Sequence, residues 1–299
     1  MLGKILAVST TIALSISIAS AADIAQSRAT FSASEIVNKN VAARGGLQAW
    51  RAVQTMSMEG KLGAGGNQRA ALPVPAAGGK QGKVDVPSRP TEEAKLPFVM
   101  KMERSRKLRF ELQFKGQTAV QVYDGANGWK LRHYLNRLEV EPFSKEELKA
   151  SSMQPDLDGP LVDYVAKGTH VELEGMEKVE DRNTYKLKLT MKDGRVVHVW
   201  INAQTFLEAK IEGLPRRLDG VEHPVEVFYR DYRQVNGLQI PFVLETAVLP
   251  VAGKAAPIPG GLNGPVPTEK IVIDKVEVNP KLDASLFVKP QVQIASNRH

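Results

Sequence analysis

Two segments of the chain, 108–114 and 185–191, alternate strictly between apolar and polar residues. A period of two is typical of a β-strand with one buried face and one face in water. Further runs rich in β-branched and aromatic residues predict strands at 53–62, 98–104, 119–123, 129–134, 169–179, 196–201, 206–212, 225–234, 239–248 and 270–278. Strands that follow one another so closely predict a mainly β chain, with an antiparallel meander that curls or closes.

Glycine-containing pairs between these runs predict tight hairpins. Asp193-Gly194 and Asn236-Gly237 each lie between two strand-like runs. Such pairs are typical of two-residue turns in which both positions have positive φ. Asp124-Gly125, followed closely by Asn127-Gly128, predicts a third and slightly longer hairpin.

Helix signals are few and local. Ser32 and Glu35 have the spacing of a capping box and predict a helix that runs to Ala43. Ser144 and Glu147 form a second capping box, which predicts a short helical insert in the middle of the meander. Shorter helical turns are expected at 46–53 and 158–165.

The first 21 residues have the features of a secretory signal peptide. Lys4 precedes an apolar run, and Ala19-Ser20-Ala21 ends in small residues, so cleavage is expected after Ala21. The run is short for a membrane span, although a retained N-terminal anchor is the alternative. We therefore expect an exported, periplasmic protein whose mature part, 22–299, is a single domain.

The composition of the chain adds two points, the absence of cysteine and two segments rich in small residues and proline. The chain has no cysteine, which excludes disulfides, thiolate metal sites, cysteine nucleophiles and an acylated N-terminal cysteine. Residues 63–90 and 249–268 are rich in glycine, alanine and proline, and are expected to be flexible loops at hairpin ends. Strands of the same kind flank both, so neither is expected to be a domain boundary.

Catalytic chemistry is not apparent in the sequence. It has none of the hydrolase, zinc-protease, nucleotide or calcium motifs, so we expect neither an enzyme nor a cofactor. The five histidines are scattered, and His198 has the spacing of a solvent-facing strand residue more than of a metal ligand. Asp156, Asp158 and Asp163 form either a carboxylate cluster or, as the neighbouring Pro155 favours, a set of turn and helix-start residues.

Positive charge gathers in the segment 101–115, within a chain of formal net charge +7. One interpretation is contact with an anionic surface such as lipid phosphate or lipid A. The other is the solvated face of two strands. A nucleic-acid partner is not expected, because the protein is exported and no stacking aromatic residues interleave the charges.

Several motifs, in order and spacing, resemble the outer-membrane lipoprotein-sorting (LolA-like) family, within the superfamily that includes LolB and LppX. They are Glu103-Arg104 leading to Leu108-Arg109-Phe110, Val122-Tyr123-Asp124-Gly125 leading to Trp129, and Val278-Asn279-Pro280 leading to Leu286-Phe287 and Pro290. The resemblance implies an incomplete antiparallel barrel whose concave apolar face is covered by short lid helices. It also implies a lid-latch role for Arg104, at a motif where Ser105 replaces the family's proline.

This resemblance predicts a cavity that binds acyl chains of lipoproteins or another lipid, for transfer between membrane-bound donor and acceptor proteins. An ordinary packed core fits the same alternation, and a non-enzymatic interaction or stress-sensing module of the envelope is the alternative function. The residues expected to line the apolar wall are Leu108, Phe110, Leu112, Phe114, Val120, Val122, Trp129, Leu187, Leu189 and Met191.

Overall fold

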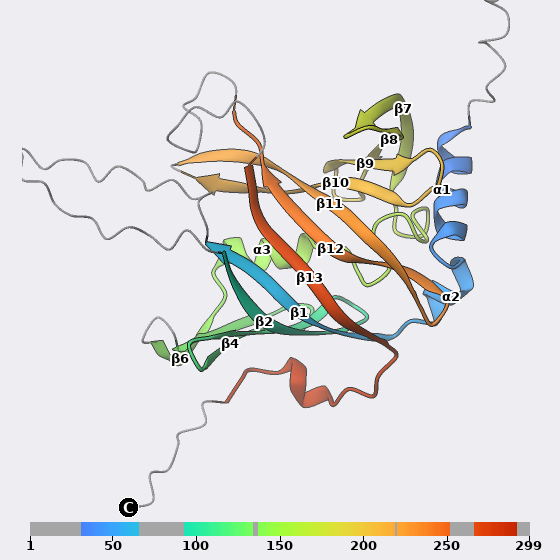
Figure 1. Ribbon diagram of the computed structural model, residues 1–299. Helices are drawn as coiled ribbons and strands as arrows, with labels where there is room; N and C mark the ends of the chain where they lie inside the picture. The colour runs from blue at the N-terminus through green and yellow to red at the C-terminus, as the bar shows by residue number, and fades with distance from the viewer. Residues whose placement is uncertain (1–30, 66–92, 134–136, 219, 252–265, 292–299) are drawn as a thin grey trace, which may run out of the picture. The chain divides into compact units, whose positions relative to one another are not determined.

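Thirteen antiparallel strands form one sheet in the computed structural model, which describes residues 31–65, 93–133, 137–218, 220–251 and 266–291 (Figure 1). The elements below all belong to one compact unit, residues 32–299. The strands are β1 Thr55–Gly65, β2 Glu93–Glu103, β3 Lys107–Phe114, β4 Gln117–Tyr123, β5 Gly128–Arg132, β6 Arg137–Pro142, β7 His170–Val179, β8 Arg182–Thr190, β9 Val196–Asn202, β10 Glu208–Leu218, β11 Val221–Val235, β12 Leu238–Val248 and β13 Val266–Val278.

The strand order is that of a meander with one additional pairing. Each strand pairs with its neighbours in the sequence, except that β1 pairs with β13 and β6 does not pair with β7. The strands β6 and β7 are therefore the two edges, and the sheet is not closed into a barrel. The predicted mainly β class with an unclosed antiparallel sheet is confirmed.

The predicted strands correspond to twelve of the thirteen, and β6 was not expected. The pair Asn236-Gly237 forms the predicted turn, with φ of 49° and 82°. Asp193-Gly194 differs, because only Gly194 has positive φ and the loop is one residue longer, closed by a hydrogen bond from Met191 N to Arg195 O. The Asp193 side chain accepts from Arg195 N, which stabilises this longer turn.

Both capping boxes are present. The helices are α1 Ala33–Ala43, α2 Leu47–Ala52, α3 Lys145–Met153 and the 3-10 helix η3 Ala284–Phe287. Ser32 caps α1 and Ser144 caps α3, each with reciprocal bonds to the glutamate three residues on. The turn expected at 158–165 is not a helix, since residues 157–168 form successive turns.

The turn between α1 and α2 packs closely on the hairpin between β11 and β12 (Figure 1). Gly45 has φ of 113°, and a Cβ there would lie 2.4 Å from Gly237 O. Arg44 O accepts a hydrogen bond from Gln239 N at 3.0 Å. Only glycine allows this approach.

One face of the sheet, called here the inner face, carries the main core. Its buried residues include Met56, Phe98 and Phe242, and they pack with Trp50 of α2. Val162, from the segment 154–168 between α3 and β7, belongs to the same core. We call residues 154–168 the covering segment, because they lie over the inner face.

The opposite, outer face has a smaller apolar cluster near the β6 edge. Val120, Val122 and Leu131 are buried there. The helix η3 contacts β3 and β4, and Arg109 Nη1 donates a hydrogen bond to Leu286 O at 3.3 Å. The C-terminal segment therefore covers part of the outer face.

Some of the predicted segments lie outside the described residues. These are the signal peptide at 1–21 and most of the two glycine-rich and proline-rich segments, 66–90 and 252–265. Of the described ends of those two segments, residues 63–65 belong to β1 and residues 266–268 to β13, whereas residues 249–251 follow β12 without strand structure.

Candidate functional site

Two cavities lie between the inner face and the covering segment. The first has a volume of about 320 Å³ and is lined mainly by β1, β2, β11, β12 and α2. The second, of about 730 Å³, is lined mainly by the end of α3, by the turn between β8 and β9, and by β10 and β11. Both volumes lie within the range of about 300–1,000 Å³ that is typical of small-molecule sites. The residues that line both are Pro155, Asp156, Gly159, Pro160, Ile211 and Tyr229.

Methionine is the most frequent apolar residue in this lining. The chain has 8 methionines. Six of them line one of the two cavities, namely Met56, Met58, Met100, Met102, Met153 and Met191. The register pairs Met56 with Met102 and Met58 with Met100 across β1 and β2, so four side chains form one patch. Unbranched thioether side chains adapt to differently shaped ligands, which suits a cavity for flexible apolar chains.

Two groups of predicted wall residues lie on the inner face. Leu108, Phe110, Leu112 and Phe114 alternate along β3, and the Phe110 ring stacks on Phe98 at 5.6 Å. Phe110 and Leu112 pack against the main core, so they support the wall of the first cavity from beside it. Leu187 and Leu189 are fully buried on β8, and Met191 lines the second cavity.

The remaining predicted wall residues lie on the outer face. The register pairs Val122 with Arg109 and with Trp129, while Val120 pairs with Glu111. Directly opposed residues in an antiparallel pair point to the same face, so Val120, Val122 and Trp129 point away from Phe110 and Leu112. The structure therefore divides the predicted set of ten between two faces.

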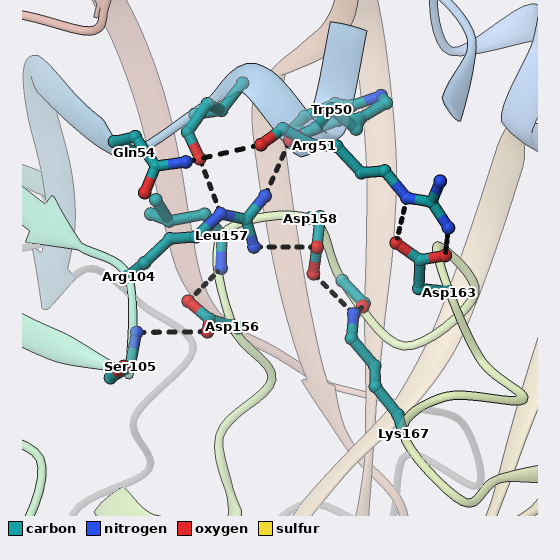
Figure 2. A network of polar contacts seen from close by, with 12 residues as sticks. Trp50, Arg51, Gln54, Arg104, Ser105, Asp156, Leu157, Asp158, Asp163 and Lys167 are labelled. Carbon is teal, nitrogen blue, oxygen red and sulfur yellow. Dashed lines mark hydrogen bonds and ion pairs between the residues drawn. The ribbon is translucent and has the colours of Figure 1, made fainter. Parts of the chain in front are cut away.

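Arg104 joins the covering segment to α2 (Figure 2). Its Nε donates to Val53 O at 2.6 Å, and Nη2 donates to Trp50 O at 2.6 Å. Nη1 donates to Asp158 Oδ2 at 2.9 Å. All three nitrogens of the guanidinium are therefore engaged, two by the end of α2 and one by the covering segment.

Asp158 is the centre of this polar network. It is only 2% exposed, and its other oxygen accepts from Lys167 Nζ at 2.5 Å. Arg44 Nη1 donates to Asp158 O at 2.9 Å. A buried carboxylate is stable only when its oxygens are paired, so these contacts hold the covering segment in one position.

Two further carboxylates of the covering segment are also engaged, as Figure 2 shows. Asp163 accepts from Arg51 at 2.8 and 2.5 Å, and this contact lowers the pKa of Asp163. Asp156 accepts from Ser105 N at 3.2 Å. The sequence interpretation of these aspartates as turn residues missed this role, because their partners come from distant parts of the chain.

The first cavity has one polar corner. Arg44 Nη1 lies 3.3 Å from Glu208 Oε1, and Tyr232 donates to Glu208 Oε2 at 3.1 Å. The Arg44 guanidinium also lies over the Trp50 ring at 4.3 Å. Burial raises the pKa of Tyr232 well above its ordinary value. No sequence motif marks this corner, since its residues come from the end of α1, from α2, β10 and β11.

Several other charged residues weighed in the sequence have structural partners. His198 lies between Glu212 and Glu174 on the outer face, and no cluster of three potential metal ligands occurs in the described part of the chain. In the basic segment, Lys107 pairs with Glu103 and Arg109 pairs with Glu111. None of the described helices is long and apolar enough to span a membrane.

No family model matches the sequence, and no curated protein matches it. Among solved structures, a LolA superfamily protein from Nitrosomonas europaea is 13% identical with a TM-score of 0.49, covering 87% of this chain and 99% of that chain. A domain assigned to outer membrane lipoprotein sorting, from Vibrio parahaemolyticus, is 12% identical with a TM-score of 0.47, covering 85% and 94%. A DUF1329 family protein from Desulfovibrio piger is 12% identical with a TM-score of 0.49, covering 87% and 98%.

The names of the first two proteins include the family that the sequence motifs resemble. Identities this low transfer no residue roles. What the site does must follow from its own geometry.

Proposed function

We propose that this protein is a non-enzymatic carrier of the bacterial envelope, which binds acyl chains of lipoproteins or of another lipid. The observation that carries the proposal is the pair of methionine-lined cavities on the inner face, beneath the covering segment. In this proposal the protein works in the periplasm. It receives cargo from a membrane-bound donor and passes it to an acceptor at the outer membrane.

The energetics of acyl transfer favour such a site. Each methylene of an acyl chain that is kept from water is worth about 0.8 kcal/mol, so a long chain does not cross an aqueous compartment unprotected. A cavity with flexible thioether side chains shelters chains of different length and branching. An unclosed sheet leaves that cavity accessible at the covering segment, without unfolding of any strand.

The covering segment has the properties of a lid. Its second half is anchored by Leu161 and Val162, which are both 0% exposed. Its first half, 154–160, forms part of both cavity walls and is tied down mainly by polar contacts to Arg104, Ser105 and Arg44. A few hydrogen bonds break more readily than an apolar core, so we assign the moving part to 154–160 and the latch to Arg104.

The proposal is tested by placing a charge in the cavity wall. Met100→Glu puts a carboxylate beside Met58, and it should lower the affinity for a fluorescent fatty-acyl probe by about tenfold or more, because the ionised group must be desolvated. Gln113→Glu introduces the same charge on an exposed position of β3 and should bind as the wild type does. Probe titrations of both variants, with circular dichroism to verify folding, provide the measurement.

An equal loss of affinity in the two variants, with folding preserved, would contradict a ligand site at these methionines. Unchanged binding in Met100→Glu would do so as well. A protein that binds no acyl probe at all would favour the alternative, an envelope interaction module on the same kind of sheet.

A further inference from the structure

Tyr229 stands at the junction of the two cavities. It lies on β11, paired with Leu244 of β12, and it lines both cavities beneath Pro155 and Pro160 of the covering segment. The walls around it are otherwise mostly apolar on this side, with Ile211 as its neighbour in both linings. A ligand that fills either cavity next to this junction contacts Tyr229.

The hydroxyl of Tyr229 has no hydrogen-bond partner in the described part of the chain. Two other tyrosines there differ: Tyr232 donates to Glu208, and Tyr123 donates to Gly125 O at 2.8 Å. The fully enclosed side-chain polar atoms without a partner, among described residues, are Asn40 Oδ1 and Arg132 Nε. Tyr229 Oη is not one of them, so it keeps accessible surface, which faces the cavities that the residue lines.

The surroundings of Tyr229 keep its hydroxyl protonated. Burial raises the pKa of Tyr229, and the nearby Glu208 carboxylate adds to this effect. Glu208 itself is occupied by Arg44 and Tyr232. The junction therefore presents one neutral O–H donor within an apolar surrounding, where a hydrogen bond discriminates strongly between ligands with and without an acceptor.

We propose that Tyr229 Oη donates a hydrogen bond to the carbonyl oxygen of an acyl ester or acyl amide, and thereby selects acylated cargo over plain hydrocarbon. The acyl chain then lies along the methionine-lined wall of the first cavity. The linkage lies at the junction, and the remainder of the cargo extends through the larger second cavity. This inference rests on the proposed function and adds to it the chemical group that the site recognises.

The test compares two competitors of matched chain length, a fatty-acid methyl ester and an n-alkane, in displacing N-phenyl-1-naphthylamine from the full-length mature protein. This fluorophore has no carbonyl group and reports only on the apolar cavity. The wild type should bind the ester about 3- to 10-fold more tightly than the alkane, as one net hydrogen bond provides. In Tyr229→Phe the ester should bind no more tightly than the alkane, because its carbonyl is then desolvated without a donor, and the alkane affinity should be unchanged.

Tyr123→Phe is the matched control, because it removes a tyrosine hydroxyl outside the two cavities and should retain the preference for the ester. The melting temperature of Tyr229→Phe should not fall, since the hydroxyl has no partner to lose. Retained ester preference in Tyr229→Phe, or an equal loss for both competitors, would overturn this inference and leave the carrier function standing. Failure of both competitors to displace the fluorophore from the wild type would overturn the carrier function as well.

Discussion

At the scale of single residues, Asp158 shows how a few polar contacts hold the covering segment in place. Its carboxylate is shared by Arg104 and Lys167, and its carbonyl is bonded by Arg44. Removing any one partner leaves a buried charge less well compensated, so the four residues act as a unit. The sequence motif located Arg104, but not its partners, because side chains that meet only through tertiary folding leave no local spacing to recognise.

The ion pair between Asp163 and Arg51 predicts a specific acid sensitivity. The hydrogen bond from Arg51 holds the pKa of Asp163 below its ordinary value of 3.8. A carboxylate whose pKa is lowered in the folded state stabilises that state fully above the unfolded pKa, and loses this contribution as the pH falls through the folded pKa. We therefore expect wild type to be more stable than Asp163→Asn near neutral pH and to lose this advantage below pH 3.8.

Urea unfolding of both proteins across this pH range measures the difference. If the difference in free energy of unfolding persisted at low pH, the Asp163 carboxylate would not be its source.

At the scale of elements, local signals predicted most of the helices and twelve of the thirteen strands in the described part of the chain, but the turn expected at 158–165 is not a helix. Both capping boxes gave the right helices, because the cap hydrogen bonds form within four residues. The alternation of apolar and polar residues in 108–114 and 185–191 also predicted the right strands, because this pattern too is visible in a short stretch of sequence. The edge strand β6 was missed, and it has only one neighbouring strand, β5.

Which face of the sheet the side chains of one strand share with those of the next strand could not be predicted in the same way. Alternation shows that Val120 and Val122 share a face, but the tight turn between β3 and β4 decides which face that is. Residue 115 has positive φ, and so does Gly116, which closes the hairpin so that Phe114 pairs with Gln117. Valine at 122 is therefore opposite Arg109, and part of the expected wall lies on the outer face.

The contacts of the covering segment predict how a variant of Arg104 binds and transfers cargo. Arg104→Leu removes three donors that tie α2 to the segment and should weaken the closed state by about 1–3 kcal/mol. The open state keeps the apolar wall, so this variant should retain cargo and fail to pass it on. Transfer of a labelled acylated protein to acceptor membranes, measured together with cargo binding, tests this expectation.

Arg182→Leu is the matched control for this variant. Arg182 is exposed at the start of β8 and lines neither cavity, so this variant should transfer cargo as the wild type does. Equal transfer by the two variants would place Arg104 among the ordinary surface charges and remove the latch from the account.

At the scale of the whole molecule, the site is covered by the chain that joins the two edges of the sheet. The sheet remains open between β6 and β7, and the chain between these two strands supplies α3 and the covering segment. The covering segment, which interrupts the meander with irregular structure, therefore lies over the cavities. The residue pattern predicted this insert, whereas a cavity was expected only from the family resemblance, because a cavity depends on the spacing between layers and leaves no pattern along one strand.

Native mass spectrometry of the protein purified from a bacterial envelope under mild conditions tests the carrier function most directly. We expect wild type to carry a bound mass corresponding to a lipid or an acylated protein, and Met100→Glu, prepared in the same way, to lack it. A wild-type protein that is consistently free of lipid, while Gln113→Glu and Met100→Glu give the same spectra as the wild type, would contradict the account.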